Sequence, residues 1–104
     1  MAEIPADAVE LARRVRDGET DAATLVGEAL AALDAVDGQL RATVWRDDER
    51  ARSWAAEAAD GPFAGVPFVV KDLDGDEAGV PNTGSSRFLV DHVPADDAPV
   101  IARL

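Results

Sequence analysis

The stretch that decides the fold is Gly61–Ser86, GPFAGVPFVVKDLDGDEAGVPNTGSS, and Lys71 lies at its centre. Lys71 is the only lysine of the chain. Apart from one histidine, all the other basic side chains are arginines. A lysine ammonium loses its proton readily when it is buried, whereas arginine stays charged, so lysine is suited to act as a general base. Lys71 ends the apolar run 66–70, which predicts a short buried strand followed by a loop rich in Gly, Asp and Pro. Such a strand end is where α/β enzymes place their chemistry.

The residues before this stretch predict helices. Asp7 and Glu10 have the spacing of a capping box, which predicts a first helix over 7–17. Thr20 is expected to cap a second helix that ends at Asp37-Gly38. Because the connection between them is short, these two helices should pack as an antiparallel hairpin.

Further elements are expected on either side of the central stretch. Leu40–Trp45 is β-prone, and Asp47 should begin a third helix that stops at Asp60-Gly61-Pro62. Asp96 or Asp97 should cap a last helix that carries Pro99 in its first turn.

The composition narrows the class of protein. A net charge of −11 leaves no basic stripe for nucleic acid or an anionic membrane. The absence of cysteine excludes disulfides and thiolate metal sites. No apolar run is long enough to span a bilayer and no signal peptide is visible, so we expect a cytoplasmic protein. The acidic, arginine-rich composition fits a halophilic source or a GC-rich genome.

The run GPFAGVPFVVKDL, followed by AGVP, RFL and DDAPVIARL, resembles the N-terminal part of amidase signature hydrolases. Its KDL form is more similar to amidases of the 6-aminohexanoate-cyclic-dimer hydrolase type than to the amidotransferase A subunits, which usually read KDN. The resemblance covers Gly61–Leu104 well, whereas the helical first half is only compatible with it. It implies that Lys71 is the general base of a Ser, cis-Ser, Lys triad whose serines lie further along than this chain extends.

The resemblance also sets the fold and domain expectations. The fold class is α/β, with N-terminal helices and the first strand or strands of a mixed sheet flanked by helices, incomplete in this chain. Residues 1–104 form the N-terminal part of a single amidase domain, with 1–60 helical and 61–104 holding the strand, the catalytic-lysine loop and the start of a helix.

The function implied is hydrolysis of a carboxylic amide to an acid and ammonia or an amine. These 104 residues alone are expected to be inactive, because they supply a base without a competent serine. The implied substrate is a small-molecule amide, with no cofactor, no metal, no nucleic acid and no membrane; a homodimer is one option. Two alternatives stay open: a glutamyl-tRNA(Gln) amidotransferase A-subunit-like fragment, and a non-catalytic acidic helical interaction module.

Residues near Lys71 have simpler interpretations as well. Asp72 can pair with Lys71, or it can accept backbone N–H bonds and order a neighbouring loop, and the family pattern favours the second role. Ser85 and Ser86 are not expected to be the triad serines, because the segment lacks the glycines that an oxyanion hole requires. Ser85 stands where the family has glycine, and it would be strained if the position needs a positive φ.

Other polar and aromatic residues are given structural roles. The acidic cluster of Asp72, Asp74, Asp76 and Glu77 lacks the calcium-loop pattern and is expected to be a solvated turn. His92 is interpreted as a loop residue. Trp45 and Trp54 are interpreted as residues that pack under the remainder of the protein, and not as a substrate platform.

Overall fold

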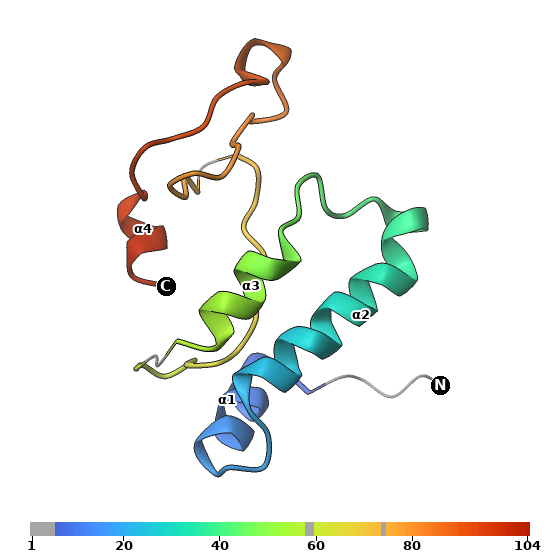
Figure 1. Cartoon of the computed structure of the whole chain (residues 1–104), viewed down its shortest axis with the longest axis vertical. Coiled ribbons are helices and arrows are strands. Elements are labelled where there is room, and N and C mark those ends of the chain that lie inside the picture. The colour runs from blue at the N-terminus through green and yellow to red at the C-terminus, as the bar shows by residue number, and fades with distance from the viewer. Residues whose placement is uncertain (1–5, 58–59, 74) are drawn as a thin grey trace. The chain divides into compact units, whose positions relative to one another are not determined.

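The computed structural model describes residues 6–57, 60–73 and 75–104, and the chain divides into two compact units, Met1–Phe68 and Val69–Leu104. The first unit contains α1 (Ala8–Arg16), α2 (Ala22–Leu40) and α3 (Asp48–Ala55), as Figure 1 shows. The second contains a short 3-10 helix, η1 (Arg87–Leu89), and α4 (Pro99–Ala102). The described part of the chain is helical and has no β-strand, so the α/β architecture expected from the sequence is not confirmed.

Aspartate caps begin all three helices of the first unit. The carboxylates of Asp7, Asp21 and Asp47 each accept a hydrogen bond from the backbone N–H three residues further on, at 2.9, 2.7 and 3.0 Å. These bonds satisfy backbone donors that the helix itself leaves free. The predicted starts at Asp7 and Asp47 are therefore confirmed, and the predicted cap Thr20 is wrong by one residue.

The core of the first unit is small and lies mainly on α2. Leu25, Val26 and Leu30 of this helix are buried, together with Ala12 of α1. Among the described residues, the helices of this unit that contact each other extensively are α2 and α3, which run side by side in Figure 1. The predicted pairing of the first two helices is therefore wrong in its main partner, because α2 continues to Leu40 and presents its length to α3.

The start of the central stretch returns to the first two helices. Gly65 has a φ of 85°, and a Cβ added there would lie 3.2 Å from Val15 Cγ1 and 3.3 Å from the Ala22 Cβ. Arg16 adds a long-range bond, because its Nη1 donates to the Pro62 carbonyl at 3.1 Å. A residue without a side chain at position 65 lets this segment close against α1 and the start of α2.

The predicted strand over 66–70 is not formed. Phe68, Val69 and Val70 are extended but unpaired with any strand in the described ranges, and their side chains are exposed. A strand that is apolar on both faces needs neighbours that complete its ladder and cover it, and residues 6–57, 60–73 and 75–104 supply none. The β-prone Leu40–Trp45 does not serve, because Leu40 is the last residue of α2 and a loop follows it.

Two helix boundaries also differ from the sequence prediction. The third helix ends at Ala55, before the Asp60-Gly61-Pro62 stop, and part of the expected remainder falls on Ala58, outside the described residues. In α4, Ala98 occupies the N-cap position and makes no side-chain cap. Asp97 is engaged elsewhere, because its Oδ1 accepts the backbone N–H of Ala78 at 2.8 Å.

Hydrogen bonds between loops organise the second unit. The N–H of Gly79 donates to the Pro94 carbonyl at 3.0 Å, and the N–H of Asn82 donates to the His92 carbonyl at 3.1 Å. The N–H of Ala98 donates to the Asp76 carbonyl at 2.8 Å. These bonds join segments far apart in the sequence, and they position the loop after Lys71.

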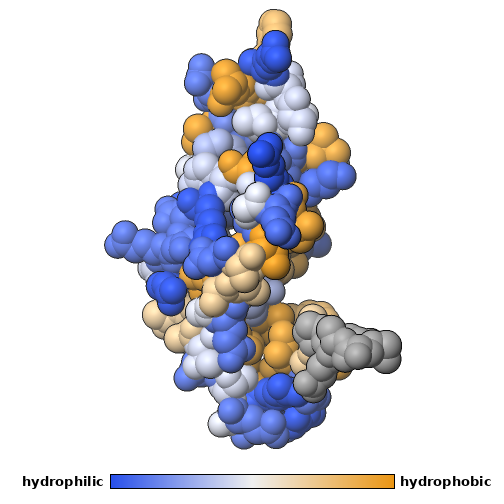
Figure 2. All heavy atoms as spheres, turned by 90° about the vertical axis from the view of Figure 1, so that its right-hand side faces the viewer, coloured by the Kyte–Doolittle hydropathy of each residue, from blue (hydrophilic) through white to orange (hydrophobic). Residues whose placement is uncertain are grey.

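Apolar side chains remain exposed in both units. On the face shown in Figure 2, hydrophobic residues in orange are visible between hydrophilic ones in blue. The exposed set includes Val44, Phe63, Phe68, Val69, Leu73, Phe88, Val90 and Val100. Trp45 and Trp54 are also about half exposed, and their packing under the remainder of the protein stays a prediction.

Candidate functional site

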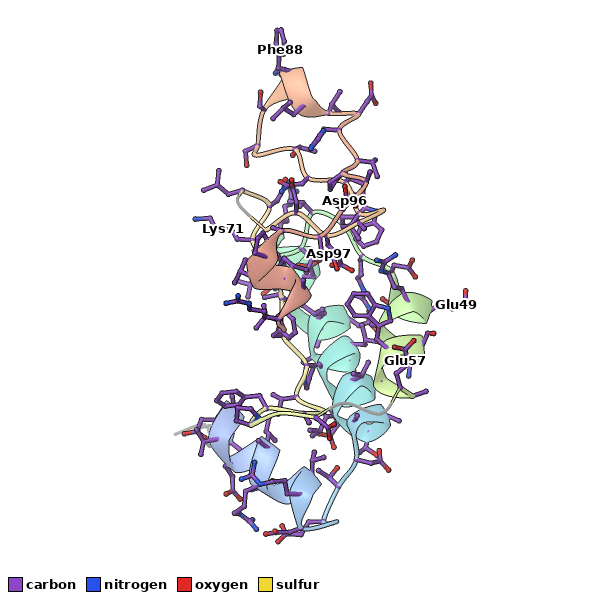
Figure 3. All side chains as sticks on the ribbon, turned by 90° about the vertical axis from the view of Figure 1, so that its left-hand side faces the viewer. Glu49, Glu57, Lys71, Phe88, Asp96 and Asp97 are labelled. Atoms are coloured by element: carbon purple, nitrogen blue, oxygen red, sulfur yellow. The ribbon has the colours of Figure 1, made fainter. Side chains whose placement is uncertain are left out.

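Lys71 lies in an exposed loop at the start of the second unit. Figure 3 shows its side chain extending away from the ribbon. Its carbonyl accepts the N–H of Leu73 at 2.8 Å, which closes a γ-turn centred on Asp72. Among the described residues no carboxylate forms an ion pair with Lys71, so the simple pairing with Asp72 is not observed.

The carboxylate of Asp72 instead holds Thr83. One oxygen accepts the Thr83 backbone N–H at 2.7 Å, and the other accepts the Thr83 hydroxyl at 2.5 Å. These bonds lower the pKa of Asp72 below its ordinary value, the hydroxyl contributing most. The loop-ordering role predicted for Asp72 is confirmed, and we name this two-bond contact the Asp72–Thr83 clasp.

The clasp holds the first residue of a tight turn. The N–H of Ser86 donates to the Thr83 carbonyl at 2.9 Å, and the two central residues, Gly84 and Ser85, have φ values of 56° and 57°. Two successive positive φ values are typical of a type I′ turn. Ser85 therefore adopts a conformation that favours glycine, and the strain expected from its replacement of the family's glycine is present.

Ser86 has a structural task of its own. Its Oγ accepts the backbone N–H of Phe88 at 3.2 Å and so caps η1. Figure 3 shows Phe88 at the end of this loop, pointing away from the rest of the unit, and the residue is 98% exposed. The structure brings Ser86 into a turn that Asp72 anchors, and no hydrogen bond connects it to Lys71 within the described ranges.

A second polar contact supports the same loop. Asn82 is buried, with 8% of its surface exposed, and its Nδ2 donates to Asp76 Oδ1 at 2.6 Å. His92 is a loop residue as predicted, and its carbonyl accepts the N–H of Asn82. The acidic residues Asp72 and Asp76 therefore receive hydrogen bonds from the chain; Asp74 lies outside the described residues.

Metal-ligating side chains do not gather in the part of the chain that the structure describes: no three of them lie close enough to hold an ion. In the same residues, no helix is both long enough and apolar enough to cross a membrane.

The other concentration of charge lies in the first unit. A cavity of about 290 Å³ is bordered by Glu10, Arg13 and Glu19, with Asp17 close by. Arg13 pairs with all three carboxylates, and with Arg14 it lowers the pKa of Glu10 to about 2. Because these ion pairs are exposed, each stabilises the fold only slightly. Their charges are satisfied within the cluster, so we assign no chemistry to it.

Comparison with known proteins agrees with the sequence around Lys71. The model of the family described as Amidase matches residues 24–104. This chain belongs to the amidase family. The match contains Lys71, Asp72 and Thr83, together with α3, α4 and most of α2, and it extends the resemblance into the helical first half.

Several curated relatives share one name, which is that of the A subunit of glutamyl-tRNA(Gln) amidotransferase. The protein of Lachnospira eligens is 35% identical over 105 residues, which cover 93% of this chain and 22% of the relative. That of Streptomyces coelicolor is 34% identical, with 93% and 21% covered. That of Anaeromyxobacter dehalogenans is 43% identical over 89 residues, with 77% and 18% covered. The chain thus spans about a fifth of the length of these relatives.

Sequence reasoning predicted the loop-ordering role of Asp72 but not its partner Thr83, and the catalytic role of Lys71 stays a prediction. Thr83 is 11 residues away from Asp72 in sequence, and no helix or strand periodicity relates the two. The signal in the sequence was the residue type, because threonine offers both a backbone and a side-chain donor to one carboxylate.

Proposed function

We propose that the complete protein hydrolyses carboxylic amides and that Lys71 is its general base. Support comes from the family match, which includes the motif GVPFVVKDL, and from the geometry around this motif. The observation that carries this proposal is that the carboxylate next to Lys71 accepts two hydrogen bonds from Thr83 and forms no ion pair with Lys71 among the described residues. A carboxylate paired with the ammonium would favour its charged form, whereas a base must be neutral.

The remaining requirements fall on residues outside these 104. A serine would attack the amide carbonyl, a second serine would relay its proton, and Lys71 would accept that proton. The side chain of Lys71 is exposed here, so the desolvation that favours a neutral lysine would be supplied by other parts of the protein.

The test compares Lys71→Arg with Lys71→Ala in the full-length protein. Arginine keeps the charge but does not become neutral, so both variants should lose about 10²–10⁴-fold in kcat/KM. Arg103→Ala, which removes an exposed cation at the end of α4, is the control and should keep its activity. A Lys71→Arg protein with near-normal rates would show that position 71 needs only a cation.

A more specific function is favoured by the names of the relatives. Their shared name denotes one component of an amidotransferase for glutamyl-tRNA(Gln), which would work together with other subunits. This alternative competes with a free-standing amidase of the KDL type. With a net charge of −11, this part of the chain would leave contact with RNA phosphates to the other components.

Two assays on the full-length protein separate these functions. Release of ammonia from a simple primary amide by the purified protein alone supports the free-standing amidase. Transfer of the amide nitrogen to glutamyl-tRNA(Gln), seen only when other subunits have been supplied, supports the role in an amidotransferase.

A further inference from the structure

Residues 71–73, which carry Lys71, are tied to a distant part of the second unit by the side chain of Asp72. The γ-turn bond from Leu73 N–H to the Lys71 carbonyl is local and closes only the three residues around Asp72. For residues 71–73, the Asp72–Thr83 clasp is the long-range contact seen among the described residues, since it reaches the turn at 83–86. The direction of the Lys71 backbone is therefore coupled to that turn through the adjacent carboxylate.

We propose that Asp72 and Thr83 are positioning residues for Lys71 in the amide-hydrolysis reaction. This inference rests on the proposed function, because it gives the clasp a task only if Lys71 takes part in the chemistry. Asp72 acts through the backbone that it shares with Lys71, and it does not itself touch the substrate.

Two features of the clasp suit this task. One carboxylate oxygen of Asp72 accepts a backbone N–H and the other accepts a hydroxyl. Two hydrogen bonds restrict rotation of the Asp72 side chain more than one would. The turn that receives these bonds is itself closed by a hydrogen bond, which the Ser86 N–H donates to the Thr83 carbonyl across Gly84 and Ser85. A base must lie within hydrogen-bond reach of the proton that it removes, so a small displacement of Lys71 is costly.

The chain contains a matched control for this proposal. Asp37, near the end of α2, makes the same two-bond clasp with Thr43: its Oδ1 accepts the Thr43 backbone N–H at 3.0 Å, and its Oδ2 accepts the Thr43 hydroxyl. As with Asp72, the threonine lowers the pKa of Asp37. The two clasps have the same chemistry, but the second lies in the first unit and holds no part of the Lys71 loop.

The experiment measures kcat, KM and Tm for variants of the full-length protein. Asp72→Ala should lower kcat about 100-fold with KM changed less than about twofold, because the base is misplaced while substrate binding remains. Thr83→Val keeps the backbone N–H bond and should lower kcat less, and Thr83→Ser, which restores a hydroxyl, should recover most of it. Asp37→Ala and Thr43→Val should lower Tm and leave kcat unchanged.

The outcomes separate this inference from the proposed function. If Lys71→Arg is inactive while Asp72→Ala and Thr83→Val keep their kcat, the positioning role is wrong and the base role stands. If Asp37→Ala lowers kcat as much as Asp72→Ala, the clasp acts only on stability and the inference is overturned. Should Asp72→Ala not fold, the comparison of Thr83→Val with Thr83→Ser decides. If Lys71→Arg is fully active, both proposals fail together.

Discussion

At the scale of single residues, Ser85 shows a conflict between side chain and backbone. Its φ of 57° lies in the left-handed region, where a Cβ atom crowds the following carbonyl. We expect Ser85→Gly to raise the free energy of unfolding by about 0.5–1 kcal/mol, because the relieved strain exceeds the entropy cost of glycine. Chemical denaturation measures the change.

The neighbouring serine is the control for that substitution. Ser86 has a φ of −107° and its hydroxyl caps η1, so Ser86→Gly should destabilise the protein. Equal effects at both positions would mean that the Ser85 backbone is not strained in solution.

A second prediction at this scale concerns how the stability contributed by the Asp72–Thr83 clasp depends on pH. Hydrogen bonds from Thr83 lower the pKa of the Asp72 carboxyl below its ordinary 3.8 in the folded protein. The contribution of the clasp to stability is therefore complete above the ordinary value and is lost as pH falls through the lowered pKa. In an NMR titration, the Thr83 amide resonance should shift with a midpoint below 3.8.

Removing the titrating group tests the assignment. In an Asp72→Asn protein the Thr83 resonance should show no such transition, while the Thr43 resonance should still report the low pKa of Asp37. A Thr83 midpoint at or above the ordinary value would show that the clasp is absent in solution.

At the scale of elements, the contact between 61–66 and the first two helices depends on Gly65. A side chain there would adopt an unfavourable positive φ and would approach Val15 and Ala22 closely. We expect Gly65→Ala to destabilise the first unit by about 1–3 kcal/mol through backbone strain and overpacking. Thermal denaturation followed by circular dichroism measures this loss.

Gly38 provides the opposite control, because it lies within α2 and has open space around it. Gly38→Ala should raise stability by about 0.5–1 kcal/mol, as alanine loses less entropy in a helix. A Gly65→Ala protein as stable as the original would show that the segment does not close against α1.

The sequence predicted helix starts better than it predicted long-range contacts. Asp7 and Asp47 were identifiable because a cap bonds to an N–H only three residues away. Asp97 also stands just before a helix, but its carboxylate accepts the backbone N–H of Ala78, 19 residues away, and does not cap α4. A local sequence pattern does not show that a distant N–H competes with the helix for this carboxylate. The Asp72–Thr83 clasp was not predicted for the same reason. The residue type and the flanking motif singled out Lys71, whose catalytic role stays a prediction.

The run 66–70 is apolar, as a buried strand would be, but the strand predicted from this pattern is not formed in the described residues. Its apolar residues signal burial, but a strand also needs partners, and their presence is a property of the surrounding chain. Within the described ranges Phe68 and Val69 stay exposed, so the pattern predicted the chemical character of the segment without its structure.

At the scale of the whole molecule, the 104-residue chain presents much apolar surface to water. Large hydrophobic side chains are exposed in both units, and among the described residues the buried apolar core consists of a few residues of α1 and α2. We expect the isolated chain to bind a hydrophobic dye and to unfold over a broad temperature range, because a small core supports little cooperativity. Dye fluorescence and calorimetry measure these properties.

A substitution on the exposed loop supplies the control. Phe88→Ser changes the most exposed of these side chains and should lower dye binding without lowering Tm. A sharp, cooperative transition with no dye binding would contradict the expectation and would favour an independently stable module.

The position of the single lysine has a practical consequence. Lys71 is exposed and follows the division between the units, Met1–Phe68 and Val69–Leu104, by only a few residues. An endoproteinase that cleaves after lysine would therefore cut this chain at one bond and release two peptides, 1–71 and 72–104. The second peptide would retain Asp72 and Thr83 and all of the second unit except its first three residues, so most of each unit could be obtained without altering a codon.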